Sequence, residues 1–254
     1  MISALLTAVI PALVLPWVLV PLRWPPLFAI LPLAPLAWVY ARAVREGRAR
    51  DATTLALAWA LALTAATVAA AARSPQSALQ GIWHAGAFRD EMVGWIATGR
   101  GPEGNLRLFL PRVLLEYALV WVLSAASLGA AALLLGSLLL GYMNGYVGWV
   151  VANADPSMPA LTTALVAWPP WSVARVFSFI LAGTAGALWG AKRFYRGSSP
   201  EGVDTGRTVG RLALFSAMLL LLDIGLKWWL APIWREWLHA LLGASAGLEA
   251  GGTG

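Results

Sequence analysis

The sequence alternates between long apolar runs and short polar segments. The longest run extends from Phe109 to Ala152, and only Arg112 and Glu116 are charged within it. A helix that crosses a bilayer needs about 20 mostly apolar residues at 1.5 Å rise per residue, so this run is long enough for about two crossings. The pattern therefore predicts an all-α fold, a polytopic transmembrane helical bundle.

Taken together, the apolar runs predict about seven spans. Two of them lie between Pro111 and Trp171, with the simplest turn at Ser124–Gly129. The alternative is one long helix to about Gly141 and a shorter return from Gly145 to Trp168. Seven prolines between Pro11 and Pro35 predict kinks in the first two spans. The other five spans are expected at Ile2–Val20, Pro26–Ala41, Thr53–Ala72, Ser172–Ala191 and Leu212–Leu230.

The polar stretch between the third and fourth spans has a helical pattern of its own. Apolar residues recur on one side (Leu79, Ile82, Trp83, Gly86, Val93 and Ile96), opposite Gln80, His84, Asp90 and Glu91. Such a pattern predicts an amphipathic helix that lies in the membrane interface. We divide the single integral membrane domain, 1–254, into a hairpin with the third span (1–72), this outer segment (73–111), a core (112–232) and an amphipathic, Gly-rich tail (233–254).

The basic residues predict how the chain is oriented. They cluster in two short loops, one at 42–51 with four arginines and one at 192–211 with Lys192, Arg193, Arg196, Arg207 and Arg211. Short loops rich in Lys and Arg stay in the cytoplasm, which places the N-terminus inside and 73–111 outside. The basic loops that set this orientation account for the net charge of +6, so we do not expect nucleic acid as a partner.

Composition leaves little room for catalysis, because 59% of the residues are hydrophobic and 12% charged, against about 25% charged in soluble domains. Cysteine is absent, and neither His84 nor His239 has a second ligand at metal-binding spacing. We expect no catalytic residues, no metal and no cofactor. His84, Asp90 and Glu91 could form an outer acid–base group, but a solvated helix face explains them more simply. The 15 Trp residues lie mostly near predicted span ends, which is typical of an interfacial belt.

A few charged and polar residues interrupt the spans. Arg112 with Glu116, and Asp223 with Lys227, are spaced to pair along one helix face. Alternatively, Asp223 faces the protein interior and meets Arg175 or Asn144, since an ionisable group in a span is costly without a partner. Asn144, Arg175 and Asp223 are therefore our candidate intramembrane polar centre.

Small residues give a second pattern in the same half. Gly183, Gly186 and Gly190 form a small helix face that admits a neighbouring helix, and Asn144-Gly145 is expected to break its span. With Asn105-Leu106-Arg107 and Trp168-Pro169-Pro170-Trp171-Ser172, this order resembles the stage II sporulation protein M family over about 105–232. That family has an Asn-rich entry, an intramembrane Asn-Gly, Pro-His-Gly followed by Glu and Pro-Ala, and a closing Gly-x-x-Gly-x-x-x-Gly helix.

The polar part of the family motif differs here. Pro170 matches its proline, whereas Trp171 replaces the His, Ser172 the Gly, Arg175 the Glu and Phe177 the second Pro. The resemblance implies a non-enzymatic membrane anchor or scaffold in the bacterial cytoplasmic (inner) membrane; in sporulating bacteria such proteins recruit cell-wall remodelling enzymes. Expected partners are other membrane or envelope proteins, lipid and, as a homo-oligomer, a second copy of the chain.

Two other functions remain open. The chain could be a permease subunit of an ABC-type exporter, which would need a coupling helix in one of its cytoplasmic loops to contact a separate ATPase. It could also be an intramembrane enzyme acting on lipid, served by Asn144, Arg175 and Asp223.

Overall fold

Seven helices in the described residues are long and apolar enough to cross a membrane, which confirms the all-α fold and the expected span count. The computed structural model describes residues 1–195 and 205–243. Its spans are α1 (Ile2–Leu22), α2 with α3 (Pro25–Ile30 and Ala34–Arg45), α4 (Ala49–Arg73), α7 (Leu106–Ser127), α8 (Ala130–Asn153), α10 (Pro170–Phe194) and α11 (Thr205–Gly243).

Proline acts differently in the first two spans. The second is interrupted between α2 and α3, around Pro32, because the ring removes a backbone donor and crowds the preceding turn. The carbonyl of Pro32 is satisfied there by the indole of Trp59, at 3.0 Å. By contrast, α1 stays one continuous helix although it contains three prolines.

The region between Pro111 and Trp171 crosses twice, as the simpler of the two alternatives predicted. α7 ends at Ser127, Leu128 follows in a left-handed conformation, and Gly129 has φ 92°. A Cβ at Gly129 would lie 2.4 Å from the ring of Tyr40, so both the backbone angle and the space favour glycine. This tight turn joins α7 to α8.

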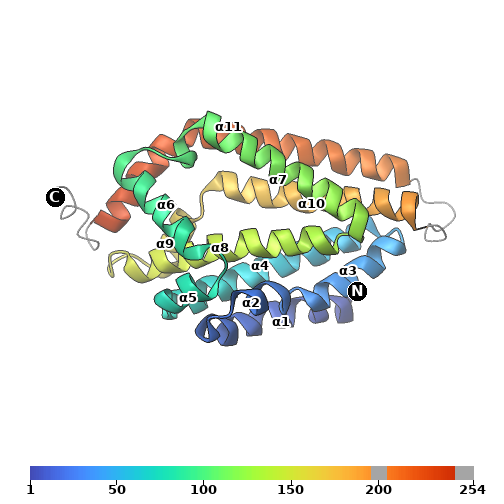
Figure 1. The fold of residues 1–254 in the computed structure, drawn as a ribbon, viewed down its shortest axis with the longest axis horizontal. Coiled ribbons are helices and arrows are strands. Elements are labelled where there is room, and N and C mark those ends of the chain that lie inside the picture. The colour runs from blue at the N-terminus through green and yellow to red at the C-terminus, as the bar shows by residue number, and fades with distance from the viewer. Residues whose placement is uncertain (196–204, 244–254) are drawn as a thin grey trace.

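The spans form two groups that share α8 (Figure 1). α1, α3 and α4 pack together on one side of α8, and α7, α10 and α11 pack together on the other. One end of the bundle, which we call the basic end, holds the N-terminus, the α3–α4 turn, the α7–α8 turn and the end of α10. The short helices α5 (Pro75–Gly81), α6 (Ala85–Thr98) and α9 (Ala160–Ala167), with the 3-10 turn η1 (Pro102–Gly104), lie at the opposite end.

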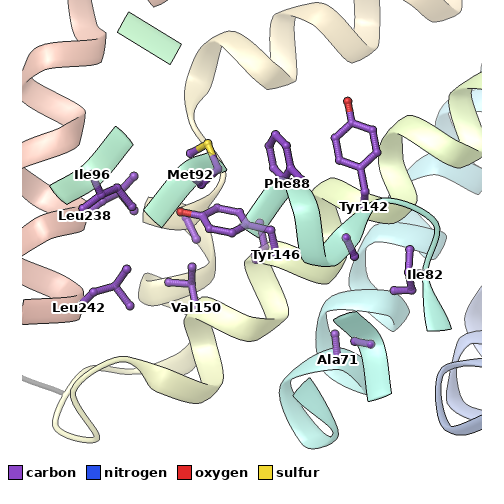
Figure 2. Packing of buried hydrophobic residues seen from close by; sticks show 14 of the residues in the cluster. Ala71, Ile82, Phe88, Met92, Ile96, Tyr142, Tyr146, Val150, Leu238 and Leu242 are labelled. Carbon is purple, nitrogen blue, oxygen red and sulfur yellow. The ribbon is translucent and has the colours of Figure 1, made fainter. Parts of the chain in front are cut away.

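The single amphipathic helix expected in 73–111 is wrong, because the segment forms two helices. α5 ends at Gly81, and His84, in a left-handed conformation, precedes α6. The break turns Trp83 outward, whereas Ile82 and Ile96 are buried as expected. Phe88 and Met92 on α6 pack with Tyr142 and Tyr146 of α8, and Leu238 near the end of α11 approaches Ile96 (Figure 2).

The expectation that Asn144-Gly145 breaks its span is also wrong. α8 continues without interruption through both residues. A Cβ at Gly145 would lie 3.1 Å from Ala85 and 3.3 Å from Ile82, so the glycine lets α6 and its preceding turn approach the helix. Close packing against a neighbour, rather than a bend, explains this glycine.

The last helix is longer than the expected span at Leu212–Leu230. α11 has 39 residues, about 58 Å at 1.5 Å per residue, and continues through Pro232 to Gly243. The part of the expected tail at 233–243 is therefore helix, and it packs on α6 and α9. The rest of the tail, 244–254, and the middle of the second basic loop, 196–204, lie outside the described residues.

Candidate functional site

An ion pair between α10 and α11 lies inside the bundle. Arg175 donates from Nε to one oxygen of Asp223 at 2.9 Å and from Nη2 to the other at 3.1 Å. Asp223 is 0% exposed, so its charge has no access to water or lipid. Two parallel hydrogen bonds between a guanidinium and a carboxylate form the strongest common arrangement of such a pair. This contact fixes α11 against α10.

Asp223 does not pair with Lys227, although the spacing along α11 would allow it. Lys227 instead donates to Glu103 in η1 at 2.8 Å, and its ammonium lies 4.5 Å from the centre of the Phe109 ring. The two charges on α11 therefore bind two different elements. No pattern in the sequence marks Glu103, which stands alone among the glycines and proline of a turn.

Arg112 and Glu116 do pair along α7, at 3.1 Å. Arg112 also donates to the hydroxyl of Tyr142 on α8, at 3.3 Å. The sequence predicted the local partner, and the contact across to α8 was missed because helix spacing reports only neighbours on the same helix.

Asn144 is buried but belongs to a separate network. Its amide oxygen accepts from the indole of Trp168 at 3.1 Å, and its amide nitrogen donates to Thr64 on α4 at 3.2 Å. Of the three residues of the candidate polar centre, the structure brings Arg175 and Asp223 into contact, while Asn144 joins α8 to α4 and to the start of α10.

A third network, which sequence reasoning missed, lies closer to the basic end. Ser178 on α10 donates to the carbonyl of Ser216 on α11 at 2.8 Å, and Ser216 donates to the carbonyl of Ser178 at 2.9 Å. Ser216 also reaches the hydroxyl of Tyr117 on α7 at 3.0 Å. Small hydroxyl residues at helix contacts are common in membrane bundles, and here they join three helices.

The glycine face of α10 packs against α7 of the same chain. A Cβ at Gly183 would lie 3.3 Å from the hydroxyl of Ser124, and one at Gly186 would lie 2.9 Å from the carbonyl oxygen of Trp121. At Gly190 it would lie 2.1 Å from the carbonyl oxygen of Ala125, an impossible contact. These glycines bring two helices of this bundle close together, so the helix they admit is internal.

The structure does not support the alternative of an acid–base group formed by His84, Asp90 and Glu91. Asp90 pairs with the adjacent Arg89, at 2.7 Å, and His84 contacts the ring of Tyr142 edge-on. Within the described residues, no group of three His, Asp or Glu side chains could hold a metal ion.

In the half of the bundle away from the basic end, polar residues line a cavity of about 40 Å³ between α6, α7, α8, α10, α11 and η1. Arg112, Arg175 and Lys227 contribute cations, and Glu91 and Glu103 contribute carboxylates. A buried water needs about 10–15 Å³, so the cavity has room for about three waters or one group of similar size. The ion pairs are thus arranged around a small polar space.

The architecture identifies the class of protein to which this chain belongs. Seven apolar helices of membrane-spanning length, with paired charges inside the bundle, make this chain a multi-pass integral membrane protein. No protein-family model, curated protein or solved structure matches it.

Proposed function

We propose that this chain is a non-enzymatic scaffold, or a subunit of a larger envelope complex, in a bacterial cytoplasmic membrane. The observation that carries the proposal is the contrast between the two sides of α11. One side is fastened to the bundle by Asp223, Lys227 and Arg235, and the other carries a row of exposed apolar side chains.

The exposed row extends past the hydrocarbon region. From Thr205 to Lys227 the helix measures about 34 Å at 1.5 Å per residue, close to the roughly 30 Å of a bilayer core. Beyond Lys227 it still exposes Trp228, Trp229, Ile233 and Trp237. Trp residues at this level can contact lipid headgroups, and a row that continues past the span is also available to a protein partner. The other side of this stretch packs on α6.

The orientation supports a partner on the outer side of the membrane. The last turn of α3 carries Arg42 and Arg45, Arg48 precedes α4, and the last turn of α10 carries Lys192 and Arg193. These helix ends lie with the N-terminus at the basic end (Figure 1). Short basic segments stay in the cytoplasm. The N-terminus is accordingly assigned to the cytoplasm, and the α6 end with the Trp row to the outside, where envelope assemblies act.

The alternative, a permease subunit of an ABC-type exporter, requires a cytoplasmic helix to contact an ATPase. The α3–α4 loop is a three-residue turn, Glu46–Arg48, closed by ion pairs of Glu46 with Arg42 and Arg48. It contains no separate helix. The other basic loop lies partly outside the described residues.

The test compares two exposed tryptophans. The chain is purified in mild detergent from its membrane, and co-purifying proteins are quantified by mass spectrometry for the wild type, Trp229→Ala and the control Trp38→Ala. Trp229 is 70% exposed and Trp38, on α3, is 66% exposed. A scaffold that uses α11 loses its partner at least tenfold in Trp229→Ala and keeps it in Trp38→Ala.

Other results contradict the proposal. Equal recovery in both variants would show that the α11 face meets lipid alone. A co-purifying ATPase whose activity this chain stimulates would favour the exporter subunit, and a second copy recovered alone would limit the assembly to a homo-oligomer.

A further inference from the structure

Two cavities lie end to end inside the bundle and meet at Arg175. The first is the polar cavity described above, and the second is an apolar cavity of about 70 Å³ between α3, α4, α7, α8 and α10. Met143, Ser172 and Arg175 line both. Along α8 the apolar cavity extends from Met143 to Gly129, about 21 Å at 1.5 Å per residue, and so ends at the α7–α8 turn of the basic end.

Together the two cavities extend across most of a membrane. From Ser172 to Lys192, α10 measures about 30 Å at 1.5 Å per residue, which is the thickness of a bilayer core. The polar cavity, which Ser172 lines, therefore lies at the boundary away from the basic end. Glu91 and Pro102 in its lining are partly exposed there. The apolar cavity occupies the remaining depth toward the basic end.

The size of the cavities limits what can pass through them. A buried water needs about 10–15 Å³, so the polar cavity holds about three waters and the apolar cavity about five to seven. Hydrogen-bonded waters are spaced by about 2.8 Å, so a single file over about 21 Å needs seven or eight. The apolar cavity thus has room for little more than one file of waters. A hydrated metal ion does not fit, whereas a proton passes along such a file from one water to the next.

Hydroxyl groups stand at the basic end of the apolar cavity. Tyr40 on α3 donates to Thr184 on α10 at 3.1 Å, and the hydroxyl of Thr53 on α4, a partly exposed residue, lies 3.5 Å from that of Thr184. Ser124 on α7 lines the cavity beside Gly183, and its buried hydroxyl has no partner among the described residues. These hydroxyls lead from the cavity toward the surface of the basic end.

An apolar stretch separates the hydroxyls from Arg175. From Arg175 to Thr184, α10 measures about 14 Å at 1.5 Å per residue. The side chains that line the cavity between them are apolar, among them Leu139, Phe179 and Ile180. Apolar cavities stay dry, and a dry apolar constriction closes a path for ions until water fills it. The structure therefore has polar groups at both ends of a closed passage.

We propose that the two cavities form a gated proton path. Protons enter the waters of the polar cavity beside Glu91 and Glu103, cross the apolar stretch when water fills it, and leave through the hydroxyls of Tyr40, Thr184 and Thr53. Only O–H bonds of water and hydroxyls form and break, and the membrane potential drives the flow. The path is independent of the scaffold role, because none of these residues belongs to the exposed face of α11.

The ion pair at the junction is compatible with proton passage. A lone guanidinium inside a pore repels protons. Here both oxygens of Asp223 accept hydrogen bonds from Arg175, at 2.9 and 3.1 Å, so the pair carries no net charge.

Gly136 allows two opposite changes in the apolar stretch. It lies on α8 midway between Gly129 and Met143, and a Cβ there would meet no atom within 4 Å. Gly136→Ser places a hydroxyl in the dry stretch and favours water there, whereas Gly136→Leu fills the space. Gly225 on α11 also has no atom within 4 Å of its Cβ position, is exposed and lines neither cavity. Gly225→Ser and Gly225→Leu are therefore matched controls.

The experiment measures proton flux into vesicles that contain the purified protein and a pH-sensitive dye, with a K⁺ gradient and valinomycin setting the membrane potential. Gly136→Ser is expected to raise the flux at least tenfold over the wild type, and Gly136→Leu to give no more than protein-free vesicles. Both Gly225 variants should match the wild type. Unchanged flux in Gly136→Ser would overturn the proposal. Entry of Na⁺ into the same vesicles at a similar rate would also overturn it, because a leak caused by misfolding passes both ions.

A second comparison tests the exit at the basic end. Tyr40→Phe, added to Gly136→Ser, is expected to lower the proton flux at least threefold because it removes the hydroxyl that bonds Thr184. Tyr195→Phe is the control, since its hydroxyl bonds the carbonyl of Ala126 and lines neither cavity. Both variants must keep the elution volume and tryptophan fluorescence of the parent. Equal flux in the two would show that protons do not leave through Tyr40 and would refute the path.

Discussion

Removing the charge of Asp223 is expected to destabilise the bundle strongly. Asp223→Asn keeps the shape of the side chain but leaves the guanidinium of Arg175 without a counter-charge. Asp223 is fully buried and accepts two hydrogen bonds, at 2.9 and 3.1 Å. Removing one partner of such a pair costs about 3–5 kcal/mol, so the free energy of unfolding should fall by that amount.

The measurement is unfolding in mixed micelles, followed by the fluorescence of the 15 tryptophans. Glu46→Gln is the control, because it breaks two exposed ion pairs in the α3–α4 turn and should leave the unfolding curve almost unchanged. The double variant Arg175→Met, Asp223→Leu removes both charges together and should unfold close to the wild type. A loss below about 1 kcal/mol in Asp223→Asn, the range of exposed pairs, would refute the view that this pair is closed to its surroundings.

Three further outcomes are expected. Gly190→Ala should destabilise the protein by about 1–3 kcal/mol through overpacking against the α7 backbone, and Gly225→Ala should not, as thermal unfolding of both would reveal. The chain has no cysteine, so single cysteines can report its topology. In intact cells, Arg48→Cys should not react with a membrane-impermeant thiol reagent and Arg100→Cys should react. The reverse labelling pattern would show that the topology is the opposite of the predicted one. Hydrogen bonds from Arg42 and Arg48 lower the pKa of Glu46 from its ordinary value of 4.5, so more than half of this carboxylate should be ionised at pH 4.5. An NMR titration that shows half or more of it protonated at that pH would contradict this pair geometry.

Sequence patterns predicted the parts of the fold that depend on one segment at a time. Apolar runs located the seven spans, and the glycine after Leu128 fits the turn between α7 and α8. The two basic loops, which we expected on one side of the membrane, begin at the same end of the bundle (Figure 1). Each of these features depends on length, hydropathy or local backbone freedom, which neighbouring residues in the chain determine.

The errors concern contacts between segments. Spacing along α11 offered Lys227 as one partner of Asp223, but the folded chain uses the alternative, Arg175. Glu103, the partner of Lys227, was not foreseen. Gly145 suggested a helix break because its contact with Ala85 is invisible in the sequence. Such pairings depend on how helices are arranged in space, and a single sequence gives no direct measure of that.

The cap on α6 has a consequence for how the protein is made. Arg235 donates from Nε to the carbonyl of Ile96 at 2.9 Å and from Nη2 to that of Ala97 at 3.3 Å, at the negative end of the α6 dipole. The ribosome releases α6 long before Arg235, so this end of α6 stays uncapped until the seventh span has been inserted. A chain that stops before α11 would therefore leave the carbonyls of Ile96 and Ala97 without this cap and would expose Ile96, which Leu238 of α11 otherwise covers.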